Sequence, residues 1–156
     1  MNRTIVCYFS ASGVTKGGAQ RVANYLNGDL FEIEPVEKYT EADLDWMDKT
    51  SRSTIEMQDK TSRPKIVNKI ANLGDYDKVI IGFPVWWYTA PTIINTFIEE
   101  NDLTNKNVYI FVTSGSSSFG GSLKDLKETY PNINFIAGAR FTSNLSDEEI
   151  NNLING

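Results

Sequence analysis

Three hydroxyl side chains and a glycine follow an apolar run that ends at Phe9. They are Ser10, Ser12, Gly13 and Thr15. A helical pattern begins directly after them, and a helix N-terminus offers unpaired amide groups and about half a positive charge. One hydroxyl is enough for a helix cap, which is the simpler interpretation. The surplus of hydroxyls, together with the close turn that Gly13 permits, favours a cradle for an oxyanion.

The type of anion follows from what this stretch lacks. It contains neither the GxxxxGK[ST] pattern of a nucleotide-binding P-loop nor the GxGxxG pattern of a dinucleotide site. It also lacks carboxylates that would hold Mg²⁺ beside a triphosphate. We therefore expect a terminal monoester phosphate that is bound without a metal.

Two further loops have unusual compositions. The stretch "PVWWYTAP", residues 84–91, sets Trp86, Trp87 and Tyr88 side by side. At least one of these rings should face a cleft and stack on a planar ligand, although the alternative is that they seal the end of a sheet. The stretch "SGSSSFGG", residues 114–121, is nearly free of large side chains. Its peptide groups could reach the polar edge of a ring, and the alternative is a flexible surface turn.

The elements that must position these loops alternate along the chain. Five apolar runs, "TIVCYF", "LFEIEP", "KVIIGF", "NVYIFVT" and "INFIAG", read as strands. Between or after these runs, apolar residues have helical spacing at 19–26, 66–73, 93–98 and 123–130. A last helix is predicted after Ser146, which forms a capping box with Glu149. Leu145 is placed to form a hydrophobic staple with Ile150. The polar stretch 36–63 predicts a loop and an exposed helix.

Strands that alternate with helices predict an α/β fold with a three-layer, doubly wound, five-stranded parallel sheet of order 2-1-3-4-5. The continuous apolar runs suit central strands, whereas "LFEIEP" alternates and suits an edge. Ligands bind such sheets outside the carboxyl ends of the strands, near the switch in strand order. The loops after the first, third and fourth strands should therefore converge on one site.

Composition excludes several classes of protein. The 156 residues are 40% hydrophobic, which predicts a single globular domain over 1–156. A net charge of −5 argues against nucleic acid as a partner. The chain has no histidine, which rules out Ser-His-Asp and Cys-His catalysis, and its single Cys7 should be a buried thiol. Without a signal peptide or membrane span in the sequence, we expect a cytoplasmic protein with no membrane partner.

At these residues the chain resembles the flavodoxin family, over essentially its whole length. Residues 10–15 resemble the [ST]-x-[ST]-G-x-T phosphate loop for FMN, and "PVWWYTAP" and "TSGSSSFGGSL" resemble the second and third flavin loops of a bacterial subgroup of short-chain flavodoxins. The resemblance implies a flavodoxin-like fold and FMN as cofactor. The implied phosphate residues are Ser10, Ser12, Gly13, Val14, Thr15 and Lys16. Those along the isoalloxazine ring are Pro84, Val85, Trp86, Trp87, Tyr88, Thr89 and Ala90, with Thr113, Ser114, Gly115, Ser116, Ser117 and Gly120 at its other edge.

Two residues depart from the family pattern. Val14 replaces an asparagine of many members and loses one side-chain hydrogen bond in the phosphate loop. Tyr88 stands where related sequences often have glycine after the aromatic residue. In the family a peptide of this loop flips to accept a hydrogen bond from N5 of the reduced flavin. A tyrosine raises the free energy of that flip by about 1 kcal/mol, which weakens the inference of one-electron chemistry.

The resemblance implies an electron carrier whose chemistry belongs to FMN, with redox proteins as partners that dock through a basic surface. It assigns no catalytic residue and no metal. The alternative is an NAD(P)H-dependent flavin or quinone reductase, with a pocket for NAD(P)H or a small electron acceptor built by Tyr88, Phe119 and residues 39–57. A signalling receiver domain lacks support because the acidic cluster it needs after the first strand is replaced by residues 10–13. A further alternative is an interaction domain without a cofactor.

Overall fold

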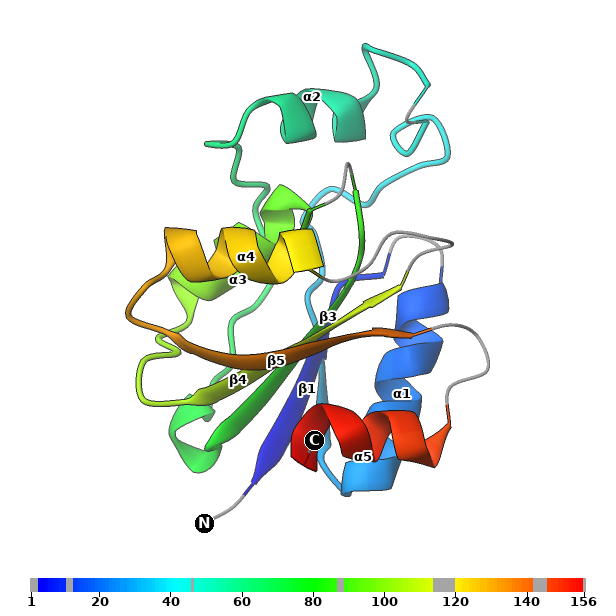
Figure 1. Ribbon diagram of the computed structural model, residues 1–156. Coiled ribbons are helices and arrows are strands. Elements are labelled where there is room, and N and C mark those ends of the chain that lie inside the picture. The colour runs from blue at the N-terminus through cyan, green and yellow to red at the C-terminus, as the bar shows by residue number, and fades with distance from the viewer. Residues whose placement is uncertain are drawn as a thin grey trace.

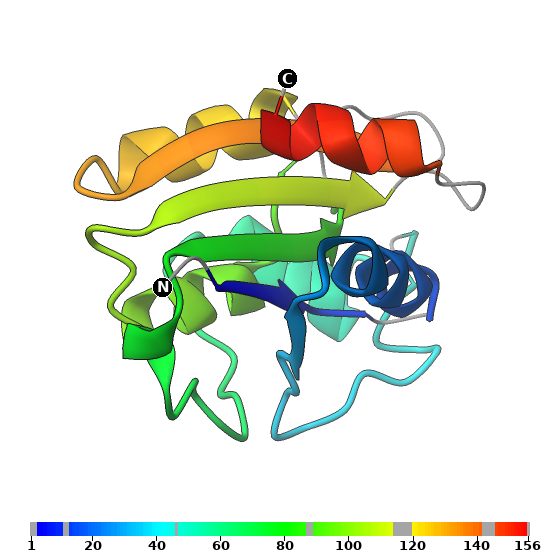
Figure 2. The same ribbon diagram turned by 90° about the horizontal axis from the view of Figure 1, so that it is seen from below.

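The computed structural model describes residues 3–10, 13–45, 47–86, 89–113, 120–141 and 146–155. Its centre is a parallel sheet with the order β2-β1-β3-β4-β5, which confirms the predicted topology. Figure 2 shows the strands side by side, from β5 at the top through β4 and β3 to β1. The strands are β1 Thr4–Tyr8, β2 Asp29–Glu32, β3 Lys78–Pro84, β4 Asn107–Thr113 and β5 Asn134–Phe141.

Helices cover both faces of this sheet (Figure 1). The helices are α1 Val14–Leu26, α2 Arg52–Gln58, α3 Thr92–Glu100, α4 Gly120–Thr129 and α5 Asp147–Asn155, with a short 3₁₀ helix, η1, at Leu73–Asp75. The apolar faces of α3 and α4 pack on one side and those of α1 and α5 on the other. The helices predicted from residues 19–26, 93–98 and 123–130 are therefore confirmed, and Ser146 accepts the predicted capping hydrogen bond from the Glu149 amide.

Alternation along β1 explains why its run is continuously apolar. Ile5 and Cys7 enter the core under α3 and α4, while Val6 and Tyr8 enter the core under α1 and α5. Cys7 has no exposed surface, and burial raises the pKa of its thiol. The expectation of a buried structural thiol is confirmed.

The helix predicted over residues 66–73 is wrong. Ile66 forms an antiparallel bridge with Pro35, and Val67 donates its amide to the Glu34 carbonyl at 2.8 Å. The backbone groups of residues 66 and 67 thus form hydrogen bonds with the segment directly after β2, and they form none within a helix. The amide of Ile70 donates to the side chain of the buried Asn101 at 2.9 Å. These partners are distant in the sequence, so the local apolar spacing could not reveal them.

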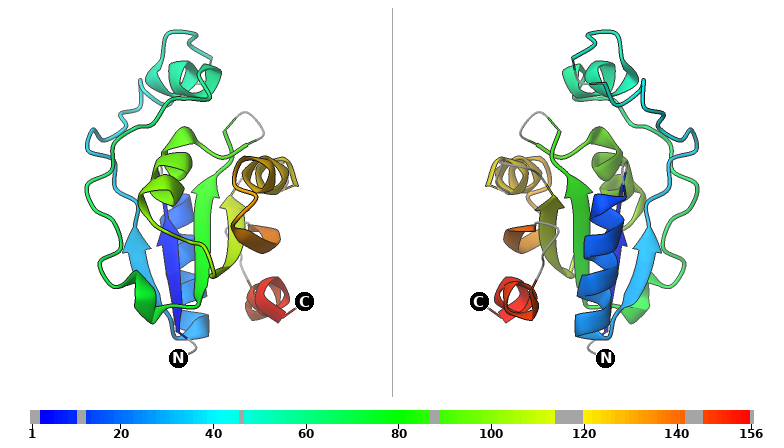
Figure 3. Two further views of the ribbon diagram at one scale, coloured as in Figure 1. Left: turned by 90° about the vertical axis from the view of Figure 1, so that its left-hand side faces the viewer. Right: turned by 90° about the vertical axis from the view of Figure 1, so that its right-hand side faces the viewer.

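The polar segment 36–63 contains a loop and a helix, as predicted. Its helix is α2, whose cap Ser51 accepts a hydrogen bond from the Thr54 amide. Figures 1 and 3 place α2 beyond the carboxyl ends of the strands. The Thr40 amide donates to the Asp43 carboxylate, and the hydroxyl and amide of Thr50 donate to the Asp48 carboxylate. These hydrogen bonds lower the pKa of both carboxyl groups.

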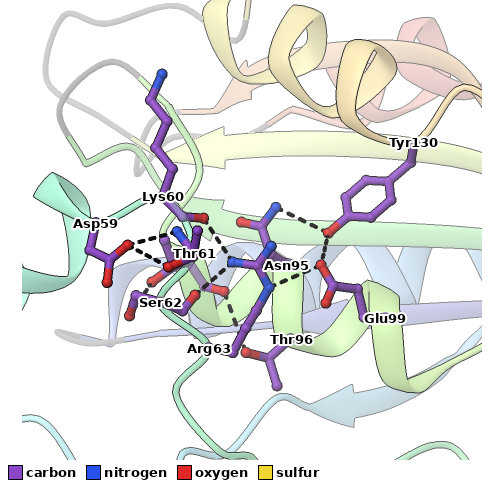
Figure 4. Close-up of polar contacts among 10 residues, drawn as sticks. Asp59, Lys60, Thr61, Ser62, Arg63, Asn95, Thr96, Glu99 and Tyr130 are labelled. Atoms are coloured by element: carbon purple, nitrogen blue, oxygen red, sulfur yellow. Dashed lines mark hydrogen bonds and ion pairs between the residues drawn. The ribbon is translucent and has the colours of Figure 1, made fainter.

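The end of this segment is tied to α3 and to the residue after α4 (Figure 4). Arg63 pairs with Glu99 at 2.9 Å, and the Tyr130 hydroxyl donates to the same carboxylate at 2.5 Å. Asn95 donates to the Tyr130 oxygen at 3.2 Å. Partial burial and the Glu99 carboxylate raise the pKa of Tyr130 to about 12.

Tyr130 makes the stability of the fold sensitive to alkaline pH. Its folded pKa is about 12 and its ordinary value is 10.0, so the folded state keeps a proton that the unfolded state loses. The stabilisation is complete below the ordinary pKa and is lost as pH rises through this window. We expect the unfolding free energy of Tyr130→Phe to fall less steeply there than that of wild type, measured by urea denaturation at a series of alkaline pH values. Equal slopes would contradict this prediction.

Candidate functional site

The first loop turns at a glycine, and none of the described side chains caps the helix that follows. Gly13 has a φ of 94° and is the N-cap of α1, so the N-cap residue has no side chain that could cap the helix. The Ser10 hydroxyl instead accepts the Gly13 amide at 3.0 Å. The cap-only interpretation therefore does not hold for Ser10, and the first-turn amides of α1 have no partner within the helix. This end of α1 has the donors and the dipole that an oxyanion requires.

A buried hydrogen bond joins the first and third loops. The Thr15 and Thr113 hydroxyl oxygens lie 2.6 Å apart, although the residues are 98 positions apart in the sequence. Thr113 is predicted to lie at the edge of the ring, and its hydroxyl lies against the first turn of α1. Val14 and Lys16 are exposed on that turn.

The second loop is fixed at both of its described ends. Trp86 and Thr89 exchange two backbone hydrogen bonds of 3.0 Å, and the Val85 amide donates to the Thr113 carbonyl. The Trp86 ring lies edge-on to the rings of Phe9 and Tyr39, with centroid separations of 5.6 and 5.4 Å. Trp86 thus packs on the end of the core, as the sealing interpretation requires. Pro84 is half-buried at the end of β3, and Ala90 is buried.

Tyr39 connects this aromatic cluster to α2. Its hydroxyl donates to Glu56 at 2.5 Å, and the Arg52 guanidinium lies 3.9 Å from its ring centre. Arg52 and Glu56 form an ion pair one helical turn apart, at 2.9 Å. Burial, followed by the hydrogen bond to Glu56, raises the pKa of Tyr39. Sequence reasoning had placed residues 39–57 near a pocket but had not singled out Arg52 and Glu56, whose four-residue spacing is a usable signal.

Thr89 carries a further contact that the sequence did not suggest. Its hydroxyl donates to Asp125 of α4 at 2.6 Å and ties the second loop to the helix that follows the third. Gly120 is the exposed first residue of that helix.

Several predicted residues lie outside the described part of the chain. They are Ser12, Trp87, Tyr88, Ser114, Gly115, Ser116, Ser117 and Phe119, and the Leu145 staple lies outside it as well. Their roles, and the consequence drawn from Tyr88, stay predictions. The described ends of all three loops nevertheless meet at one edge of the sheet.

The described residues form no metal site, and the groove that they line lies away from this edge of the sheet. No group of His, Cys, Asp or Glu in them is arranged to hold a metal ion. An open groove of about 530 Å³ lies between 98–104 and 129–133. It borders the amino ends of β4 and β5, at the opposite edge of the sheet. None of the described helices has the length and apolar character of a membrane span.

A doubly wound parallel sheet with a helix N-terminus at its switch point is typical of the α/β proteins that bind ligands at the carboxyl edge of the sheet. The chain belongs to the flavodoxin family, because the flavodoxin family model matches residues 3–156.

Solved structures agree with this assignment. A candidate flavoprotein of Bacteroides eggerthii is 44% identical, with a TM-score of 0.96 over 99% of this chain and 97% of that one. One from Bacteroides uniformis is 47% identical, with a TM-score of 0.93 over 99% of both chains. A flavoprotein of Lactobacillus acidophilus in complex with FMN is 25% identical, with a TM-score of 0.75 over 99% of this chain and 100% of that one. No curated protein has a sequence that matches this one.

Proposed function

We propose that this protein binds FMN at the carboxyl edge of its sheet and serves as an electron carrier. The observation that carries the proposal is the N-terminus of α1, where Gly13 turns the chain and none of the described side chains caps the first-turn amides. Support comes from the related Lactobacillus flavoprotein, which was solved with FMN.

The residues present fit the cofactor. The first-turn amides of α1 would receive the phosphate, with Ser12 as the predicted hydroxyl donor beside them. The loop between Trp86 and Thr89 would border the ring, and the core beneath Trp86 keeps that loop in place. FMN, when bound, supplies the electron-transfer chemistry, and the protein sets its orientation and surroundings.

The negative charge supports a redox protein with a basic docking surface as the partner. The net charge is −5, and the carboxylates of Asp43 and Asp48 contribute to it. Such charge speeds association with a basic partner and is screened by salt. We place this role in the cytoplasm, which suits the unpaired, buried thiol of Cys7.

A reductase is the second candidate, and the position of α2 favours it. The contact between Tyr39 and Trp86 anchors segment 36–63 at the edge where the flavin would lie. This segment could form one wall of a pocket for NAD(P)H or a small acceptor. A pure carrier has no need of such a wall.

Two measurements test these functions in order. The purified protein, or the protein after addition of FMN, should show a bound-flavin absorbance spectrum, and failure to bind FMN would contradict both candidates. NADPH or NADH is then added without oxygen. A carrier should keep its flavin oxidised until a redox partner or chemical reductant is supplied, whereas rapid direct bleaching would establish the reductase.

A further inference from the structure

The hydroxyl groups of Thr15 and Thr113 together carry two protons, and the hydrogen bond between them involves only one. Each hydroxyl carries one proton, and a pair at 2.6 Å shares only one between its oxygens. Thr15 and Thr113 are 2% and 7% exposed, so water has little access to the remaining proton. Within the described part of the chain, neither hydroxyl oxygen has a second partner.

A buried donor normally has an acceptor, because leaving it unpaired costs about 1–3 kcal/mol. Thr15 is the second residue of α1 and belongs to the first turn, whose amides would receive the phosphate in the proposed site. A phosphate oxygen at that turn would accept the remaining proton if Thr15 carries it. The Thr15 hydroxyl has a proton available for the phosphate only when Thr113 is the donor in the hydrogen bond between the two residues.

We propose that Thr113 is a positioning residue of the phosphate site. Its hydroxyl donates to Thr15 Oγ1, and the Thr15 proton is thereby directed to a phosphate oxygen. In the opposite arrangement the Thr15 hydroxyl donates to Thr113 and presents only a lone pair to the phosphate. A hydroxyl that accepts a hydrogen bond also becomes a stronger donor. This inference rests on the proposed binding of FMN.

The test compares FMN with riboflavin, which has the same ring but no phosphate. Thr113→Val removes the hydroxyl at nearly constant volume, and Thr113→Ser retains it. Dissociation constants are measured from the change in flavin fluorescence on binding. We expect Thr113→Val to bind FMN about fivefold to tenfold more weakly and riboflavin as wild type does, with Thr113→Ser restoring the preference for FMN. If the valine variant does not fold, Thr113→Ala should lose the same preference.

A double variant tests whether Thr113 acts through Thr15. Thr15→Val should itself lose preference for FMN, and adding Thr113→Val should lower it no further, because the proton that Thr113 orients is gone. An additional loss in the double variant would overturn the inference. An equal weakening of FMN and riboflavin by Thr113→Val would also overturn it, since that result indicates a merely structural role.

The wild-type protein separates this inference from the function on which it rests. Wild type that binds neither flavin would overturn both. Wild type that prefers FMN, with the same preference in Thr113→Val, would overturn only the role of Thr113.

Discussion

Gly82→Ala should destabilise the protein by about 3 kcal/mol, at the upper end of the usual range for an overpacked core. Gly82 pairs with Phe111 on the neighbouring strand, and the Phe111 ring lies directly over the glycine. A Cβ at residue 82 would lie 2.0 Å from Cζ of that ring. The ring has little freedom to withdraw, because it is fully buried and stacked on Phe141 at 5.1 Å.

Chemical denaturation measures this effect as a lower midpoint with an unchanged slope. Gly17→Ala is the matched control, since a Cβ there meets nothing within 4 Å and alanine is the better helix former. It should leave stability equal or raise it by less than about 1 kcal/mol. Phe111→Leu should recover part of the loss in the Gly82→Ala background, because it removes the ring that clashes. A Gly82→Ala variant as stable as wild type would contradict the packing described.

Val14→Asp should change the stability of the free protein and its affinity for FMN in opposite directions. Val14 is 54% exposed in the first turn of α1, which contains no acidic residue. A carboxylate at a helix N-terminus stabilises the free protein by about 0.3–1 kcal/mol. It also repels a bound phosphate. At a separation of about 5 Å and an effective dielectric constant near 20, that repulsion is about 3 kcal/mol per unit charge, or about 100-fold in affinity.

Titration with FMN and riboflavin tests this prediction. Val14→Asp should bind riboflavin as wild type does, because riboflavin has no phosphate to repel. Val14→Asn is the uncharged control and should bind FMN at least as well as wild type, since asparagine can donate a hydrogen bond within the loop. Equal FMN affinities for the aspartate and asparagine variants would mean that the phosphate lies elsewhere.

Much of the architecture was predictable because it depends on local patterns. Continuous apolar runs of strand length identified the buried parallel strands, and apolar residues on one helical face identified α1, α3 and α4. Once strands and helices alternate, the preferred handedness of the crossovers leaves few possible orders. The same reasoning pointed to the carboxyl edge as the site.

Local patterns were misleading where hydrogen bonds to residues distant in the sequence determine the backbone conformation. Residues 66–73 have helical spacing, yet Ile66 pairs with Pro35 and the Ile70 amide is bonded to Asn101. A hydrogen bond to a segment 31 positions away leaves no trace in the local spacing. The aromatic loop raised a similar difficulty, because only the positions of Phe9 and Tyr39 show that Trp86 packs on the core.

The sequence by itself determined the family, the order of the strands and the loop that begins with Ser10, because residue types and their spacing carry that information. The tertiary structure alone decided that the Ser10 hydroxyl accepts the Gly13 amide, that Gly13 is the N-cap of α1 and that the Thr113 hydroxyl is hydrogen-bonded to Thr15. The physical reason is the direction of individual hydrogen bonds. A sequence names the donors and acceptors at an edge of a sheet, but their pairing depends on distances that only the packed chain sets.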